Sequence, residues 1–117
     1  MSSQLDFSGK TILVVGIHKG GMGGATCRLI AHGGGTVIAV DHDPSYLDDI
    51  AAELRALGGE CRTHVADLMD PAQCEALVPA ILEKFGSFDG IANIAGGTRA
   101  EEWMPLDETP GDSFWKT

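Results

Sequence analysis

Thr11-Ile-Leu-Val-Val15, followed by Gly16-Ile-His-Lys-Gly-Gly-Met-Gly23, is the stretch that decides the fold. Its first five residues form a continuously apolar run, which is typical of a strand buried on both faces of a parallel sheet. Glycines between a strand and a helix let the backbone approach a ligand closely and aim free N–H groups at an anion. The segment therefore predicts a buried strand, an anion-binding turn and then a helix.

Apolar strand-like runs and helix-like runs alternate along the rest of the chain. The pattern predicts helices over 25–32, from 44 to about 57 and from 71 to about 85, and strands over 36–40, 61–65 and 88–94. Strands joined by helices of this length run parallel, with right-handed crossovers. We therefore predict an α/β fold, namely a Rossmann-like open parallel sheet of about four strands in the order 3-2-1-4 with flanking helices, incomplete at the edge of strand four.

The second and third predicted helices each have an apolar face with the 3.6-residue period. The residues expected to be buried there are Leu47, Ile50, Ala51, Leu54 and Leu57 in one helix, and Leu77, Ile81, Leu82 and Phe85 in the other. Asp70, Pro71 and Gln73 have the pattern of an N-cap, a first-turn proline and a capping-box partner. A polar loop is predicted over 97–108 and a further helix start at 109–112.

Length and charge limit the function classes. At 117 residues the chain is expected to be one partial domain, over 1–117. The net charge of −9 repels phosphate backbones and anionic lipid, which argues against nucleic acid and membrane partners. We find neither an apolar stretch of the roughly 20 residues needed to cross a bilayer nor a signal peptide. Three scattered cysteines indicate reduced thiols, and we expect a cytoplasmic protein.

Polar or glycine residues follow each predicted strand, where open parallel sheets bind ligands. Asp41 comes directly after the second strand, and a carboxylate there can accept both hydroxyls of an adenosine ribose. Asp67 could accept from an adenine amino group, and Asn93 could tie neighbouring strand ends together. Each of these residues is also a common turn former, so that reading stays open.

The glycine turn itself excludes two readings. A P-loop needs Lys and Ser or Thr after Gly21, but Met22 and Gly23 follow. The G-x-G-x-x-G fingerprint would need glycine where Thr26 stands. His18 and the Asp41-His42-Asp43 run lack metal-ligand spacing, so no metal site is predicted.

Taken together, Leu5-x-x-x-Gly9-Lys10, the glycine turn, Asp41, Asp67-Leu68 and Asn93-x-Ala-Gly96 resemble the short-chain dehydrogenase/reductase family. The resemblance implies an NAD(P)-dependent oxidoreductase that moves hydride between nicotinamide and an alcohol or ketone, and a homo-oligomer. Because Asp41 would repel a 2′-phosphate, NAD is favoured over NADP. The cofactor-binding residues that the resemblance implies are Gly16, Gly21, Met22, Gly23, Asp41, Asp67, Leu68, Asn93, Ala95 and Gly96.

The chain departs from the family pattern in its glycine spacing and in its catalytic residues. Four residues separate Gly16 from Gly21 where the family has three, so either one residue is inserted or the register is Gly16, Gly20 and Met22. The family's catalytic Ser and Tyr-x-x-x-Lys have no counterpart, since Ile50 stands four residues after Tyr46, the only tyrosine. We therefore assign no catalytic residue, and expect residues 1–117 to be the cofactor-binding half.

Two other functions stay open. One is a catalytically silent module that binds a dinucleotide without turnover. The other is an S-adenosylmethionine-dependent transferase, whose sheet also places glycines after strand one and an acid after strand two. Asn93-x-Ala-Gly96 counts against the transferase, because that fold does not call for it.

Overall fold

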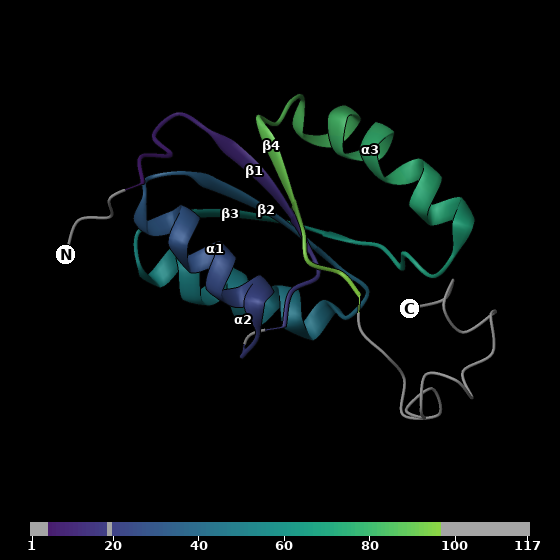
Figure 1. Ribbon diagram of the computed structural model, residues 1–117, viewed down its shortest axis with the longest axis horizontal. Coiled ribbons are helices and arrows are strands. Elements are labelled where there is room, and N and C mark those ends of the chain that lie inside the picture. The colour runs from purple at the N-terminus through teal and green to yellow at the C-terminus, as the bar shows by residue number, and fades with distance from the viewer. Residues whose placement is uncertain (1–4, 19, 97–117) are drawn as a thin grey trace, which may run out of the picture.

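The computed structural model describes residues 5–18 and 20–96. Strands and helices alternate there in the order β1 (Thr11–Val15), α1 (Met22–His32), β2 (Thr36–Asp41), α2 (Pro44–Ala56), β3 (Glu60–Val65), α3 (Pro71–Phe85) and β4 (Gly90–Asn93). The four strands form one parallel sheet in the order β3-β2-β1-β4 (Figure 1). The predicted Rossmann-like fold and its strand order are confirmed.

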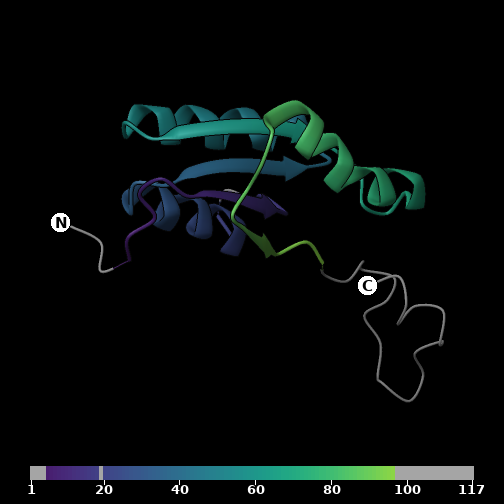
Figure 2. The ribbon, with the colours of Figure 1, turned by 90° about the horizontal axis from the view of Figure 1, so that it is seen from above.

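Helices cover both faces of the sheet, with α1 and α2 on one face and α3 on the other (Figures 1 and 2). Alternate residues of a strand point to opposite faces, so Val14 packs with α1 and α2 while Leu13 packs with α3. The larger core cluster, under α1 and α2, contains Val14, Ile17, Cys27, Ile30, Val37, Ala39, Leu47, Ile50, Ala51, Leu54 and Cys61. The smaller one, under α3, contains Leu13, Val15, Ile38, Val40, Ala66, Leu77 and Ile81.

Backbone hydrogen bonds bring the segments that follow the strands to one edge of the sheet. The N–H of Gly16 donates to the carbonyl of Val40 at 2.9 Å. The N–H groups of Ile94 and Ala95 both donate to the carbonyl of Val15, at 2.8 and 2.9 Å. This edge is the carboxyl end of every strand, because all the strands run parallel.

Helix α1 and strand β4 differ most from the sequence expectation. Helix α1 begins at Met22, three residues before the predicted start, because Gly21 is its N-cap and the glycines at 23 and 24 are buried within the helix. Strand β4 covers only Gly90–Asn93, since it ends where β1 ends. The predicted loop over 97–108 and helix start at 109–112 lie outside the described residues.

Aspartates cap α2 and α3. The hydroxyl and the N–H of Ser45 both donate to Asp43, at 2.7 and 2.9 Å, and they lower the pKa of that carboxyl below its ordinary value. Asp70 accepts from the N–H of Ala72 at 3.0 Å, which confirms the predicted N-cap. The capping box is wrong in detail, because the side-chain oxygen of Gln73 accepts from the N–H of Asp67 instead, at 2.9 Å.

The predicted buried faces of α2 and α3 are confirmed except at three positions. Leu57 follows the last turn of α2 as its C-cap and is 55% exposed. Leu82 is 43% exposed, and Phe85 is half-buried at the edge of the cluster, because α3 is fully buried against the sheet only at Leu77 and Ile81. Among the described residues no second helix lies beside α3 on its face. No helix in the described part of the chain combines the length and the apolar character needed to span a membrane.

The sheet ends at β4 within the part of the chain that the structure describes. In the described residues β4 pairs with β1 on one side only. Ile91 pairs in register with Leu13 and is 53% exposed, whereas Leu13 is fully buried. The described chain therefore leaves apolar surface uncovered at this edge.

Candidate functional site

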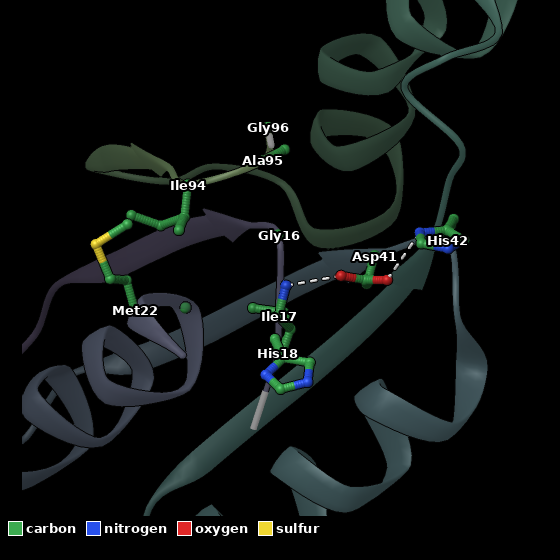
Figure 3. Close-up of a pocket in the computed structure, with 10 residues that line it drawn as sticks. Gly16, Ile17, His18, Met22, Asp41, His42, Ile94, Ala95 and Gly96 are labelled. Atoms are coloured by element: carbon green, nitrogen blue, oxygen red, sulfur yellow. Dashed lines mark hydrogen bonds and ion pairs between the residues drawn. The ribbon is translucent and has the colours of Figure 1, made fainter. Parts of the chain in front are cut away.

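A hollow of about 230 Å³ lies at the carboxyl edge of the sheet (Figure 3). Three segments that are far apart in the sequence form its walls: the turn between β1 and α1, the end of β2, and the residues after β4. The lining residues are Gly16, Ile17, His18, Met22, Gly23, Asp41, His42, Ile94, Ala95 and Gly96. The hollow is therefore where the sequence predicts ligand binding in an open parallel sheet.

Two glycines of the turn are required by close backbone approach. Gly16 has φ +95°, and a Cβ there would lie 2.6 Å from the nitrogen of Ala95. A Cβ on Gly23 would lie 1.9 Å from the carbonyl oxygen of Gly16. At Gly20 and Gly21 a Cβ would meet nothing closer than 3.5 Å. Gly16 and Gly23 therefore act as a pair that lets the start of α1 rest on the end of β1.

This geometry separates the two glycine registers that the sequence leaves open. In the alternative register Met22 would stand where the last glycine belongs, but Met22 is 73% exposed and Gly23 is the residue against Gly16. The register Gly16, Gly21 and Gly23, with one inserted residue, fits the backbone. Gly21 does not line the hollow, but it lies directly beside it as the N-cap of α1.

The N-terminus of α1 faces this turn. Gly24 and Ala25 donate to the carbonyls of His18 and Gly21, at 3.2 and 3.1 Å. Within the described residues the N–H groups of Met22 and Gly23 have no hydrogen-bond partner. A helix start concentrates about half a positive charge on such groups. The turn therefore favours an anion, as its glycines predict.

Asp41 lies at the opposite wall of the hollow, with its side chain only 9% exposed. One carboxylate oxygen accepts from the N–H of Ile17 at 2.7 Å, which fastens the glycine turn to the end of β2. The other accepts from the N–H of Asp43 at 3.0 Å. The Nδ1 atom of His42 lies 3.1 Å from that second oxygen. Asp41 is thus placed as predicted, and it also organises its own surroundings.

Sequence reasoning did not assign four lining residues: Ile17, His18, His42 and Ile94. Ile17 and Ile94 are neighbours of predicted residues, so their places beside the strand ends could have identified them. His18 packs edge-on against the Tyr46 ring, with ring centroids 5.4 Å apart, and no sequence spacing indicates this contact.

Besides Gly21, three predicted site residues do not line the hollow: Asp67, Leu68 and Asn93. Asp67 is exposed, and its carboxylate accepts from the N–H of Met69 at 2.9 Å in a local turn. Leu68 packs against the cluster under α3. No hydrogen bond of the Asn93 side chain is seen among the described residues, so its role of tying strand ends together stays a prediction. The carbonyl of Val15 makes such a tie.

The described residues offer little for catalysis. They include no group of three or more His, Cys, Asp and Glu side chains that could hold a metal ion. Burial raises the pKa of the Cys27 thiol to about 12 and that of Cys61 to about 11, so neither is an activated nucleophile. Tyr46 contacts His18 from α2. The hollow is thus suited to binding by backbone donors and one carboxylate.

A parallel sheet with a glycine turn after β1 and an acid after β2 defines a Rossmann-like protein of the dinucleotide-binding class. The family model described as short chain dehydrogenase matches residues 10–116. The chain therefore belongs to the short-chain dehydrogenase/reductase family, a family of oxidoreductases.

Individual relatives agree with this assignment. The chain is 36% identical over 105 residues to a 3-oxoacyl-acyl-carrier-protein reductase of Thermotoga maritima, covering 90% of this chain and 42% of the relative. A short chain dehydrogenase from Mycobacterium smegmatis superimposes with a TM-score of 0.81 at 26% identity, over 98% of this chain and 46% of the other. NAD+-bound xylitol dehydrogenase superimposes with a TM-score of 0.74 at 31% identity, over 94% of this chain and 41% of the other. The chain thus spans less than half the length of these relatives.

Proposed function

We propose that the chain supplies the cofactor-binding part of an NAD-dependent oxidoreductase that moves hydride between nicotinamide and an alcohol or ketone. The observation that carries the proposal is the arrangement across one hollow of the Gly16–Gly23 contact and the Asp41 carboxylate. One wall favours a diphosphate and the other a sugar hydroxyl. The similarity to a 3-oxoacyl reductase and to an NAD+-bound xylitol dehydrogenase supports the same chemistry.

The glycine turn fits a diphosphate because its glycines let a ligand approach the backbone N–H groups at the start of α1. Gly16, Gly21 and Gly23 would hold the diphosphate, and the backbone N–H of Met22 would donate to it. A methyl group on Gly23 would fill the space that the backbone of Gly16 occupies. Asp41 would accept from the adenosine ribose and repel a 2′-phosphate, which favours NAD over NADP.

The remaining predicted contacts lie beyond the two ends of the hollow. About 230 Å³ is less than the roughly 300–1,000 Å³ of pockets that enclose drug-sized ligands, so the hollow takes only the middle of a dinucleotide. Asp67 and Leu68 would contact the adenine, on the side of β3. Asn93, Ala95 and Gly96 would line the nicotinamide side, after β4.

Hydride transfer is proposed for the whole protein, and residues 1–117 by themselves are expected to bind without turnover. The observation that favours a catalytically silent module is the place of Tyr46, the only tyrosine, on α2 beside His18. The residue four positions later is Ile50, which is fully buried and cannot serve as the family's lysine. Membership of the short-chain dehydrogenase/reductase family argues against the S-adenosylmethionine-dependent transferase.

Calorimetric titration of the protein with NAD, NADP and S-adenosylmethionine tests the proposal. We expect NAD to bind most tightly. Asp41→Asn should weaken NAD binding about tenfold or more, because the charged acceptor is lost. The ratio of NAD affinity to NADP affinity should fall for the same reason. Asp49→Ala removes an exposed carboxylate on α2, outside the hollow, and serves as the matched control. Preference for S-adenosylmethionine, or an NAD affinity unchanged in the Asp41 variant, would contradict the assignment.

A further inference from the structure

The Asp41 carboxylate has few acceptor positions left for a ligand. A carboxylate accepts about four hydrogen bonds, two at each oxygen. The N–H of Ile17 occupies one position on Oδ2, at 2.7 Å. On Oδ1, the N–H of Asp43 lies at 3.0 Å. The Nδ1 atom of His42 lies 3.1 Å from the same oxygen (Figure 3). In the free protein Oδ1 therefore has two polar neighbours at close range, whereas Oδ2 has one and keeps a position open.

A ribose with free 2′ and 3′ hydroxyls needs two acceptor positions, so one of the three present partners must leave. The N–H of Ile17 cannot, because its side chain is fully buried in the core. The N–H of Asp43 cannot, because Asp43 is the N-cap of α2. His42 differs from both: its contact is made by a side chain that is 71% exposed. An exposed side chain changes rotamer rapidly and at little cost.

His42 also has a reason to stay beside the carboxylate when the site is empty. The Asp41 side chain is only 9% exposed, and a carboxylate withdrawn from water needs polar partners. Because His42 lines the hollow, its imidazole stands beside that carboxylate at a place that a ligand of Asp41 would also use. The same side chain therefore stabilises the empty site and blocks part of it.

We infer that His42 is a specificity-determining residue that occupies the second ribose position on Asp41 and is displaced when a nucleotide with a free ribose diol binds. The inference rests on the proposed function, since it concerns the same site. It goes beyond that function in predicting that part of the binding free energy of a ribose diol is used to displace His42. A nucleotide that presents a single hydroxyl uses the open position on Oδ2 and leaves His42 in place.

Calorimetric titration with NAD, ADP and 2′-deoxy-ADP tests the inference in four forms of the protein: wild type, His42→Ala, His42→Asn and His32→Ala. His42→Ala removes the competitor, so NAD and ADP should bind about two- to tenfold more tightly while 2′-deoxy-ADP binds as it does to wild type. His42→Asn restores an N–H donor near the place of Nδ1 and should behave as wild type does. His32→Ala is the matched control, since His32 is an exposed histidine in the last turn of α1.

The possible results separate the inference from the function on which it rests. If wild type binds NAD but His42→Ala binds ADP equally well or more weakly, the inference is wrong and the proposed function stands. An equal gain for ADP and 2′-deoxy-ADP also overturns the inference, because His42 would then merely obstruct the hollow. If no form of the protein binds NAD or ADP, the proposed function fails and the inference fails with it. Thermal unfolding of each variant shows whether it is folded at the titration temperature.

Discussion

The contact between Gly23 and Gly16 makes the sharpest prediction about this protein. In Gly23→Ala the new Cβ would lie 1.9 Å from the carbonyl oxygen of Gly16, 2.9 Å from its carbonyl carbon and 3.1 Å from the Cα of Ile17. Side-chain Cβ atoms essentially never come within 3.0 Å of a non-bonded heavy atom. The start of α1 or the end of β1 must therefore move by about 1 Å. Both partners are backbone, and no side-chain rotation relieves the clash.

The displacement should cost both stability and binding. Overpacking of this kind lowers the free energy of unfolding by about 1–3 kcal/mol, which urea denaturation measures. A shift of about 1 Å in the donors around a diphosphate can reduce function about a hundredfold, so calorimetry should show NAD affinity falling at least tenfold. Gly20→Ala adds the same methyl group three residues earlier, where nothing lies closer than 3.6 Å, and should stay near wild type. Equal effects of the two substitutions, or undiminished NAD affinity in Gly23→Ala, would refute the argument.

Two further predictions concern stability. Ile81→Ala should lower the free energy of unfolding by about 2–5 kcal/mol in urea denaturation, because Ile81 is fully buried between α3 and the sheet. Leu82→Ala changes the neighbouring residue, which is 43% exposed, and should lower it by no more than about 1 kcal/mol. Similar losses in the two variants would contradict the packing described for α3. Burial and the nearby Lys84 lower the pKa of His64 below its ordinary 6.5, so the unfolded chain takes up the proton first and stability should fall as the pH drops below about 6.5. His64→Gln should make thermal unfolding less dependent on pH in that window, and an unchanged pH dependence would exclude His64 as its source.

Much of the fold follows from local patterns in the sequence. The runs at 11–15 and 36–40 are apolar without interruption, which indicates strands buried on both faces, and the helices between strands require parallel pairing. Asp70 and Pro71 mark a helix start by themselves, because their hydrogen bonds and backbone angles are local. These predictions needed no knowledge of distant contacts, and the structure confirms them.

Predictions that depend on distant neighbours were less complete. The amphipathic pattern of α3 identified Leu77 and Ile81 correctly but also included Leu82, which is 43% exposed. Periodicity places a residue on a helix face but does not say how much of that face another element covers. The early start of α1 was also missed because it depends on a contact with another segment, since Gly23 is helical where it packs against Gly16.

The features of the candidate site were likewise predicted only in part from the sequence. The sequence by itself predicted that Gly16 directly follows a buried parallel strand, that Gly23 closes the glycine turn after it, and that Asp41 stands at the end of the next strand, because strand ends and turns have local sequence signals. Only the tertiary structure decided that Gly23 touches Gly16 and that Asp41 binds the N–H of Ile17, 24 residues away in the chain. Those contacts depend on how β1 and β2 align and how α1 settles on them, which is a property of packing in three dimensions.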